Sequence, residues 1–270
     1  MKTAEDKRKD LWQSIRQEVQ ESSDKEPVLA RFLDSAVLCH GSLAEVLAFR
    51  LADKLASSMM DAPALYEIFL SILCADKGMM HSVEEDILAY YQRDPACQRY
   101  CLPLLYYKGF HAIQIHRINH ALWQNQQEML AFFFQNRASQ VFGVDIHPAV
   151  RMGSGIMCDH GTGLVIGETS ILGNNISLLH GVTLGGSGKE EGDRHPKIHD
   201  GVMIGAHASI LGNVAVGECA RVGAGSVVTS SVPAHATVVG VPARIVGEET
   251  RIPAKEMLSL IHISEPTRLR

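Results

Sequence analysis

The sequence from Ile198 to Val232, IHDGVMIGAHASILGNVAVGECARVGAGSVVTSSV, returns an aliphatic residue at every sixth position. These positions are Ile204, Ile210, Val216, Val222 and Val228, and the same step occurs upstream at Ile166, Leu172, Leu178 and Leu184. A period of six fits neither the 3.6-residue repeat of an amphipathic helix nor the two-residue alternation of a strand. It is typical of a solenoid with triangular coils, in which each side is one short strand and the sixth residue faces the axis.

Two breaks interrupt this repeat. The six-residue step holds from Ile146 to Cys158, and two extra residues within HGTG (residues 160–163) then shift its phase. A longer insertion follows at residues 185–197. Insertions in solenoids map to loops that leave the packed prism and often carry function. Both breaks contain histidine, so we expect the chemistry of the protein to lie at them.

The composition describes a globular chain without a strong charge bias. Its 270 residues are 46% hydrophobic and carry a net charge of -5, with a pI near 6.2. This charge predicts no nucleic-acid surface and no membrane patch, so the expected partners are small molecules and other proteins. No window approaches 18 uninterrupted apolar residues, which predicts no membrane-spanning helix. Six cysteines without a C-x-x-C pair, and an N-terminus without a signal peptide, favour a reducing cytoplasm.

Residues 1–142 are predicted to form a helical domain. Apolar residues recur at four-residue intervals in its first helix, and leucine recurs in the same way over residues 43–55. The sequence SVEE at residues 82–85 has the form of a capping box and predicts the start of another helix. That helix should end before Asp94-Pro95, because a helical conformation is disfavoured ahead of proline.

The solenoid is predicted over residues 143–248, with the insertion 185–197 as a loop that leaves it. After Val232 the repeat weakens, which predicts an irregular exit. Residues 249–270 are expected to form an irregular tail. The last part of it, residues 259–270, shares nothing with the preceding pattern and is expected to be disordered or foreign to the natural gene.

The first break contains a candidate acid–base pair. His160 lies on a break of a rigid scaffold, and Asp145 is a carboxylate that could hold the charged form of its imidazole. A triangular coil has about 18 residues, and these two residues are 15 apart with a two-residue bulge nearby, so adjacency fits the spacing. The alternative is that both are solvated turn residues, and spacing alone leaves both interpretations open.

The insertion GGSGKEEGDRHPK (residues 185–197) is rich in glycine and charge. It is not a phosphate-binding P-loop, because its lysine is followed by glutamate rather than serine or threonine. As a bare loop it would simply be flexible. Arg194 and His195 nevertheless offer a fork for a carboxylate and a second imidazole.

Three histidines, His111, His116 and His120, fall on a predicted helix, and the last two have the four-residue spacing of some metal ligands. The zinc-protease pattern requires glutamate directly after the first of this pair, where Arg117 stands. We therefore expect ordinary histidines on the helix surface and no metal site.

Several short motifs occur in a fixed order along the chain. They are RDPA at residues 93–96, LLYYKGFH at 104–111, DIHP at 145–148, DH at 159–160, GGSGK at 185–189, DRHPK at 193–197 and GVPAR at 240–244. With these motifs the chain closely resembles bacterial serine O-acetyltransferase, of the hexapeptide-repeat acyltransferase superfamily, over about residues 5–250. The hexapeptides alone would indicate only the broad superfamily, but the DRHPK loop joined to this helical domain is specific.

The resemblance implies an α+β protein, with an all-helical domain followed by a left-handed parallel β-helix. It implies trimers along the prism, and two trimers joined through the helical domains into a hexamer. The implied reaction transfers the acetyl group of acetyl-CoA to the hydroxyl of L-serine, the first step of cysteine biosynthesis. Acetyl-CoA is then a co-substrate, and no tightly bound cofactor or metal is expected. L-Cysteine is the expected feedback inhibitor, since it differs from serine by one atom.

The resemblance also assigns the residues that carry out the reaction. His160 is expected to remove the serine hydroxyl proton as that oxygen attacks the thioester. Asp145 is expected to orient His160 and to stabilise its charged form. Asp94 and Asp159 match positions that bind the ammonium group of the substrate. These roles come from matching motif positions and not from the spacing alone.

The remaining assignments fall mostly in the second break. Arg194 and His195 match positions that bind the substrate carboxylate, and His195 is counted among the catalytic residues as well. Gly186, Ala206 and Ala224 are the expected contacts for acetyl-CoA, because their backbones and missing bulk would line a slot for its pantetheine arm along the coils.

Three other functions are compatible with parts of the pattern. A hexapeptide acetyltransferase with another hydroxyl acceptor, such as a sugar, would keep His160 as base but would not need Asp94, Arg194 and His195 to hold a zwitterion. A metal-dependent β-helix of the carbonic-anhydrase type would need three histidines converging between subunits. A structural scaffold would have no need for the residues of the insertion.

The C-terminus departs from the pattern of the family. Family members usually end in a flexible tail with a terminal isoleucine, which docks into O-acetylserine sulfhydrylase. Here the chain ends with TRLR at residues 267–270. This ending puts the partnership with the sulfhydrylase in doubt.

Overall fold

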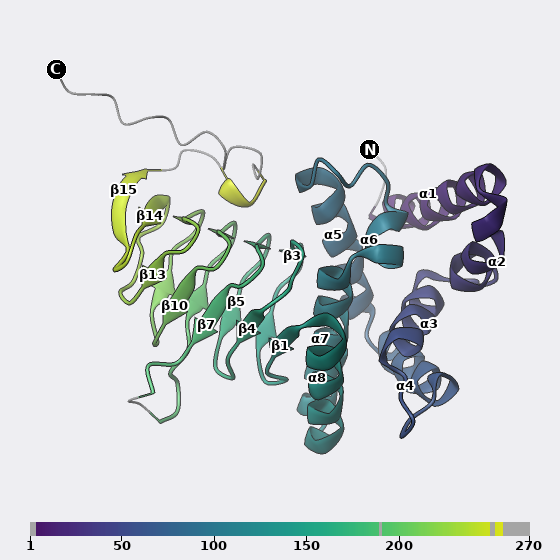
Figure 1. Ribbon diagram of the computed structural model, residues 1–270, viewed down its shortest axis with the longest axis horizontal. Helices are drawn as coiled ribbons and strands as arrows, with labels where there is room; N and C mark the ends of the chain where they lie inside the picture. The colour runs from purple at the N-terminus through teal and green to yellow at the C-terminus, as the bar shows by residue number, and fades with distance from the viewer. Residues whose placement is uncertain (1–3, 189–190, 249–251, 256–270) are drawn as a thin grey trace.

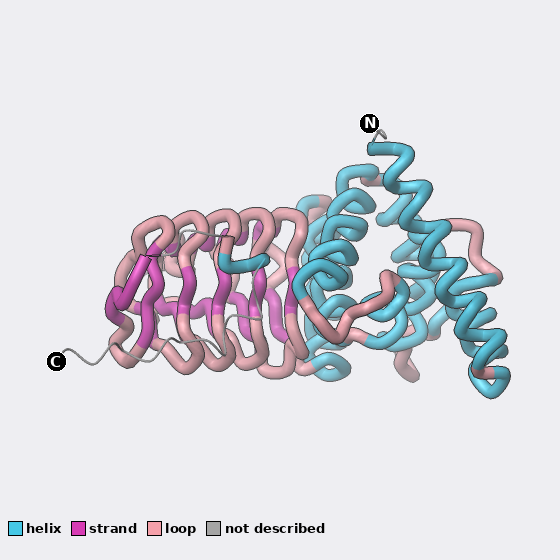
Figure 2. Tube along the Cα trace, turned by 90° about the horizontal axis from the view of Figure 1, so that it is seen from above, coloured by secondary structure: helices cyan, strands magenta, loops and turns pink. Residues whose placement is uncertain are grey.

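The computed structural model describes residues 4–188, 191–248 and 252–255. Figure 1 shows a bundle of helices beside a solenoid of short strands. Seen from above, the solenoid is a stack of coils whose strands lie in line from one coil to the next (Figure 2). None of the described helices is by itself long and apolar enough to cross a membrane. Only one bent pair of helices has the required length and composition when the two are taken together, namely Pro27–Leu38 with Leu43–Leu55.

The helical domain follows the predicted apolar spacing. Its α-helices are α1 Ala4–Lys25, α2 Ala30–Leu33, α3 Leu43–Leu55, α4 Ala62–Ala75, α5 Lys77–Arg93, α6 Cys101–Tyr106, α7 Lys108–Gln124 and α8 Glu128–Phe142. Leu11, Ile15 and Val19 are buried, which confirms the inward stripe of α1. The leucine pattern of α3 begins after Ser42, whose hydroxyl accepts a hydrogen bond from the Glu45 N–H and so caps the helix.

The start of α5 differs from the prediction. Asp76 caps this helix by accepting the N–H of Gly78 at 2.7 Å. Ser82 lies inside the helix, where its hydroxyl donates to the carbonyl of Gly78 at 3.2 Å. The capping box predicted at SVEE is therefore wrong, because an aspartate upstream performs the same capping. The predicted end is confirmed, since α5 stops at Arg93, ahead of Asp94-Pro95.

The solenoid is a left-handed parallel β-helix with three sides. Its strands are β1 Val144–Ile146, β2 Arg151–Met152, β3 Met157–Cys158, β4 Leu164–Ile166, β5 Ile171–Leu172, β6 Ser177–Leu178, β7 Thr183–Gly185, β8 Lys197–Ile198, β9 Met203–Ile204, β10 Ser209–Leu211, β11 Ala215–Val216, β12 Arg221–Val222, β13 Val227–Val228 and β14 Ala236–Val239. They form three parallel sheets, β1-β4-β7-β10-β13, β2-β5-β8-β11 and β3-β6-β9-β12-β14. Each side is one short strand, as the six-residue period predicted.

The strands on either side of both breaks stay in register, so the inward-facing aliphatic residues still pair with one another. Ile146 pairs with Ile166 across the first break, and Leu172 pairs with Ile198 across the longer insertion. Ile166 pairs with Leu184 in the coil between them. All five of these residues are buried. The extra residues are therefore accommodated at corners, and the aliphatic column along the axis stays in phase.

The exit from the solenoid is more regular than predicted. β14 continues one sheet, and β15, Arg244–Glu248, turns back to pair with it in antiparallel fashion. The prediction of an irregular exit is therefore wrong for this hairpin. The short 3₁₀ helix Pro253–Lys255 lies against the prism, where the carbonyl of Ala254 accepts a hydrogen bond from the Ser177 hydroxyl at 2.9 Å. The predictions for residues 259–270 lie outside the described residues.

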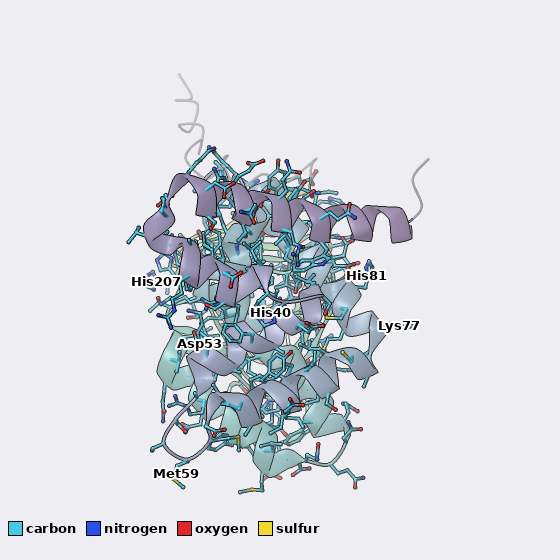
Figure 3. All side chains as sticks on the ribbon, turned by 90° about the vertical axis from the view of Figure 1, so that its right-hand side faces the viewer. His40, Asp53, Met59, Lys77, His81 and His207 are labelled. Atoms are coloured by element: carbon cyan, nitrogen blue, oxygen red, sulfur yellow. The ribbon has the colours of Figure 1, made fainter. Side chains whose placement is uncertain are left out.

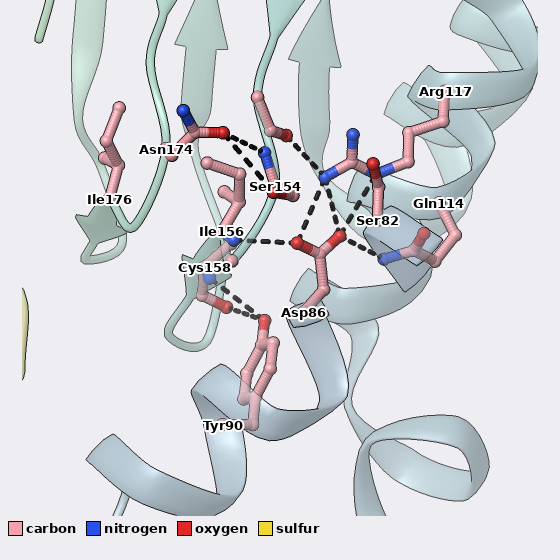
Figure 4. Close-up of polar contacts among 12 residues, drawn as sticks. Ser82, Asp86, Tyr90, Gln114, Arg117, Ser154, Ile156, Cys158, Asn174 and Ile176 are labelled. Carbon is pink, nitrogen blue, oxygen red and sulfur yellow. Dashed lines mark hydrogen bonds and ion pairs between the residues drawn. The ribbon is translucent and has the colours of Figure 1, made fainter. Parts of the chain in front are cut away.

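A buried polar network ties α5 and α7 to the first coil (Figure 4). Asp86 on α5 accepts hydrogen bonds from Arg117 and Gln114 on α7, and from the backbone N–H of Ile156 at 2.7 Å. Arg117 also donates to the carbonyl of Gly153 at 2.8 Å. The carboxylate is fully buried, so removing any one partner would leave a poorly compensated charge. The network therefore fixes the two helices relative to the solenoid.

His111 and His116 are buried, so their predicted place on the helix surface is wrong. Their Nε2 atoms lie 2.7 Å from the carbonyl of Leu104 and 3.2 Å from the carbonyl of Val150. Burial lowers the pKa of each imidazole to about 3. Helix α7 is covered by α4, α5, α8 and the first coil, so it has no large exposed face. Within the described ranges, no three His, Cys, Asp or Glu side chains are grouped to hold a metal ion.

Candidate active site

His160 lies in the turn between β3 and β4, at one corner of the prism. Its backbone is left-handed, with a φ of 56°. Asn175 adopts the same conformation at another corner, and His207 does so at the same corner two coils further on, so this geometry belongs to the turning of the coil. The imidazole is 73% exposed, and its Nε2 lies 3.7 Å from Oδ1 of Asp159. An exposed imidazole on a fixed turn, next to a carboxylate, can accept a proton from a bound hydroxyl.

The helical domain supports this turn directly. The hydroxyl of Tyr90, on α5, donates to the carbonyl of Cys158 at 2.7 Å and accepts the Cys158 N–H at 3.0 Å. At the start of α7, a Cβ on Gly109 would lie 2.0 Å from the same carbonyl oxygen. Glycine is required there because any side chain would push α7 away from the turn. Lys108 also donates to the hydroxyl of Thr162.

The end of α5 brings a second carboxylate to the same corner. Arg93 is buried and donates to the carbonyl of Gly155 at 3.0 Å and to Oδ1 of Asn175 at 3.0 Å. Asp94 follows it and accepts the N–H of Ala96 at 2.8 Å. The pKa of Asp159 is raised, mainly because the carboxyl group is partly buried. The charge of His160 lowers this pKa, and the charge of Asp94 raises it. Asp94, Asp159 and His160 therefore form one electrostatically coupled group.

Asp145 does not contact His160 in the isolated chain. Its Oδ1 accepts a hydrogen bond from Nε2 of Gln135, on α8, at 2.6 Å. The carboxylate within 4.0 Å of the His160 ring is instead Asp159. Asp145 lies in β1 and pairs with Val165 in the neighbouring strand β4. It therefore lies on the side of the prism whose strand β4 follows the His160 turn. The role of Asp145 in orienting His160 stays a prediction. The carboxylate near the His160 ring belongs to Asp159, which directly precedes His160 in the sequence.

Arg194 and His195 lie at the other end of β4, next to the residues that follow that strand. NH2 of Arg194 contacts Oε2 of Glu168 at 2.6 Å, and its NH1 donates to the carbonyl of Gly192 at 3.1 Å. The hydrogen bond from Arg194 lowers the pKa of Glu168. The guanidinium is about one-third exposed, so a ligand carboxylate can reach it and would share it with Glu168.

The hydrogen bonds around His195 determine which ring nitrogen carries its proton. The hydroxyl of Thr169 accepts the backbone N–H groups of Arg194 and His195, each at 3.0 Å, and lies 2.9 Å from Nδ1 of His195. The Thr169 N–H is also directed at Nδ1. Burial and the charge of Arg194 lower the pKa of this imidazole. His195 is therefore a neutral ring with a proton on Nε2, available as a donor.

The predicted acetyl-CoA contacts do not all come together in one chain. Ala206 and Ala224 lie in neighbouring coils at one corner, where the Gly225 N–H donates to the carbonyl of Ala206 at 2.8 Å. Gly186 follows β7 at the opposite corner, and a Cβ there would lie 3.4 Å from both Arg194 and His195. The structure thus groups Gly186 with the insertion and separates it from the two alanines.

The predicted site is divided between two edges of one side of the prism. His160, Asp159 and Asp94 lie where β4 begins, whereas Arg194 and His195 lie beyond its end. Strands rise about 3.3 Å per residue, so the two edges are on the order of 10 Å apart. A small zwitterion cannot contact both edges of the same chain in the arrangement described here.

The sequence interpretation missed the side chains that hold these groups in place. Tyr90 and Thr169 lie in no motif that the sequence singled out, and no local pattern marks them. Arg93 stands in the RDPA motif, but its partners Gly155 and Ile176 lie 62 and 83 residues further along the chain. Such contacts depend on how the helical domain docks against the solenoid.

A separate hollow lies in the helical domain. Its volume is about 580 Å³, and it is lined by residues of α3, α4 and the segment before them, including His40, Phe49, Asp53 and Tyr66. Figure 3 looks from the helical side and labels His40 and Asp53 there, well in front of the solenoid. None of the predicted site residues lines it.

A hexapeptide β-helix with a histidine turn and an extruded charged loop defines a hexapeptide-repeat transferase. The family model for bacterial transferase hexapeptides, six repeats, matches residues 195–230. The model for the N-terminal domain of serine acetyltransferase matches residues 11–115. The chain is 52% identical over 240 residues to the serine acetyltransferase of Haemophilus influenzae, covering 89% of this chain and 90% of that protein. It belongs to the serine acetyltransferase family.

Solved structures of the same family are close in fold. The Neisseria gonorrhoeae serine acetyltransferase in complex with serine is 61% identical, with a TM-score of 0.85 over 87% of this chain and 96% of that one. The Brucella abortus serine acetyltransferase in complex with coenzyme A is 49% identical, with a TM-score of 0.89 over 92% and 99%. A serine acetyltransferase in complex with cysteine is 51% identical, with a TM-score of 0.89 over 91% and 96%.

Proposed function

We propose that this protein transfers the acetyl group of acetyl-CoA to the hydroxyl of L-serine, giving O-acetylserine and CoA. The proposal rests on the different charges at the two edges of one side of the prism, with carboxylates at one edge and carboxylate-binding groups at the other. Asp94 and Asp159 beside His160 suit an ammonium group next to the reacting hydroxyl. Arg194 and the Nε2–H of His195 suit a carboxylate. A sugar acceptor has neither charge, and the relatives in complex with serine and coenzyme A support the amino acid.

The chemistry needs a base and no covalent enzyme intermediate. A serine hydroxyl is a weak nucleophile while protonated, and a positioned base typically contributes ~10²–10⁴-fold to the rate. His160 takes the hydroxyl proton as the oxygen bonds to the thioester carbon. The C–S bond then breaks, and the CoA thiolate recovers the proton from His160. Asp159 and Asp145 stabilise the charged imidazole while it holds that proton.

Completion of the site requires a second copy of the chain. One edge of the prism carries the base and the ammonium-binding carboxylates, and the opposite edge carries the carboxylate-binding groups. A closed ring of copies places the first edge of one prism against the second edge of the next, because a head-to-tail contact joins two different surfaces. We propose such a trimer, with two trimers joined through the helical domains into a hexamer.

The remaining proposals concern ligands and location. Gly186 of one copy and Ala206 and Ala224 of the next would line the slot for acetyl-CoA. L-Cysteine would compete with serine as a feedback inhibitor, which the cysteine complex of a relative supports. The scattered cysteines form no disulfide among the described residues, which fits a cytoplasmic location.

The test is a thiol-release assay on the purified full chain. It contains acetyl-CoA with a panel of amino acids and sugars, and CoA release is followed through its free thiol. We expect release with L-serine and little with D-serine, glycine or sugars. Faster release with a sugar than with L-serine would reject the proposal and leave a different hexapeptide acetyltransferase.

A further inference from the structure

A glutamine on helix α8 holds the carboxylate of Asp145. Nε2 of Gln135 donates a hydrogen bond to Oδ1 of Asp145 at 2.6 Å. Hydrogen bonds to an ionised carboxylate are shorter and roughly twice as strong as those between neutral groups. Gln135 belongs to none of the motifs that the sequence singled out. The structure therefore adds a residue that acts on a predicted member of the site.

Helix α8 and strand β1 fix the two ends of this hydrogen bond. On α8, Phe134 and Ala138 are buried in the core on the same helix as Gln135. Gly143 ends the helix in a left-handed conformation, with a φ of 67°, and β1 begins at the next residue. The residues that flank Asp145 in β1 are both buried. Donor and acceptor are thus carried by two packed elements that one residue joins.

The inner side of the Gln135 side chain faces few groups that could replace its amide as a donor. Gln135 lines a small internal cavity of about 10 Å³ whose other walls, from α7, α8 and β1, are mostly aliphatic. His116 lines the same cavity, and its Nε2 faces the carbonyl of Val150, so its Nδ1 carries a lone pair. That nitrogen is buried and has no hydrogen-bond partner among the residues that the structure describes. An acceptor of this kind cannot take over the contact with Asp145.

The charge of Asp145 acts at the edge of the prism that carries Arg194. The pKa of His147 is lowered mainly by burial, while the charges of Glu168 and Asp145 raise it and the charge of Arg194 lowers it. All three charged groups therefore lie within electrostatic range of the same imidazole. In the proposed ring, this edge meets the His160 edge of the next copy. Asp145 would then face the base of that copy.

The hydrogen bond from Gln135 determines how the carboxylate of Asp145 is turned. The terminal torsion of an aspartate has broad energy wells, so the backbone alone does not fix the plane of its two oxygens. With Oδ1 held by the amide at 2.6 Å, this plane is set, and Oδ2 takes no part in that bond. An oriented carboxylate next to an imidazole stabilises the charged form of that ring.

We propose that Gln135 is a positioning residue, whose amide orients the Asp145 carboxylate so that it stabilises the charged imidazole of His160 in the adjoining copy. This inference rests on the proposed function. Gln135 acts only through Asp145 and contacts neither substrate. Glutamine suits this role because its amide donates without carrying a charge. A glutamate at the same place would repel Asp145 and leave its Oδ1 without a donor.

A double-mutant cycle tests the role of Gln135. Gln135→Met keeps the length of the side chain and removes the donor, Asp145→Asn removes the charge, and the double variant completes the cycle. Gln135→Glu keeps the shape and replaces the donor by a charge. Gln140→Met is the matched control, because Gln140 is an exposed glutamine on the same helix. Each purified full chain is checked for assembly and thermal midpoint, and kinetic constants are measured with both substrates.

We expect Gln135→Met to lower kcat by about 10–10²-fold, because misplacing a group of the site by a small distance costs a rate of that order. The KM values for serine and acetyl-CoA should stay within about twofold, since the imidazole becomes charged only as the reaction proceeds. Gln135→Glu should lose at least as much activity. In the Asp145→Asn background, Gln135→Met should cost less than about twofold more, and Gln140→Met should match the wild type.

Three outcomes would overturn the role of Gln135. The first is a Gln135→Met enzyme with wild-type kcat. The second is an equal loss of kcat with and without the Asp145 charge, which would make the residue merely structural. The third is an Asp145→Asn enzyme with wild-type kcat, because Gln135 acts only through Asp145. If Gln135→Met fails to assemble, the same cycle built with Gln135→Glu decides. A wild-type chain without serine-dependent CoA release would instead reject the proposed function, so the two failures are distinguishable.

Discussion

At the scale of single residues, His160 combines exposure with a fixed backbone. Because its ring packs little against its surroundings, His160→Ala should leave assembly and thermal stability unchanged while lowering kcat for serine-dependent CoA release by ~10²–10⁴-fold. His235→Ala is the control, since His235 is also an exposed corner residue with a positive φ. Steady-state kinetics that retained more than a third of wild-type kcat in His160→Ala would remove it as the base.

Arg194 is predicted to act on only one substrate. Serine carries a carboxylate, and a hydrogen bond to a charged group contributes about 1.5–3 kcal/mol. Arg194→Ala should therefore raise the KM for serine by roughly 10–100-fold, with little change in the KM for acetyl-CoA. Arg151→Ala, at an exposed arginine of β2, serves as control. The reverse pattern in the two KM values would assign the insertion to the phosphates of CoA.

At the scale of elements, the site depends on how α5 and α7 dock against the first coil. Asp86→Ala removes the partner of buried Arg117 and should lower the free energy of unfolding by about 3–5 kcal/mol. Because α5 also carries Asp94 at its end, kcat/KM for serine should fall as well. Chemical denaturation and kinetics of the same preparations measure both effects.

The double variant Asp86→Leu/Arg117→Met provides the comparison for this element-scale prediction. It removes both charges together, so most of the stability should return, since no buried charge is left without a partner. Asp24→Ala, at an exposed aspartate of α1, should change stability by less than about 0.5 kcal/mol. An Asp86→Ala protein as stable as the Asp24→Ala protein would show that the network does not hold the domains together.

At the scale of the whole molecule, the divided site predicts complementation between inactive chains. His160→Ala and Arg194→Ala damage opposite edges of the prism, so a mixed ring contains some interfaces with both edges intact. With random assembly of equal amounts, about a quarter of the sites should be intact. We expect activity at low serine concentration to rise toward that fraction after the two chains are denatured and refolded together.

The control for complementation is a mixture of the two purified variants without refolding. That mixture should stay near the sum of the separate activities unless the subunits exchange. A co-refolded mixture that also stays at this sum, with assembly verified by size exclusion, would place each complete site within one chain and contradict the proposed trimer contact.

The sequence by itself determined the local architecture. The six-residue step specified the inward positions, since the geometry of each coil depends only on residues close in the chain. Residues such as Ile166, Leu184 and Ile198 are accordingly buried where the pattern placed them. The breaks in that step also marked where His160 and Arg194 leave the repeat, because extra residues can be accommodated only at corners.

Tertiary structure alone decided which of these groups meet. His111 and His116 are buried because other elements cover α7 on several sides, which no periodicity within the helix encodes. His180 comes beside His160 through the stacking of coils, although no motif contains it. The separation of Arg194 from His160 has the same origin. Residues before and after a strand lie at opposite edges of the prism, so the order of motifs along the chain cannot tell whether one chain or two complete the site.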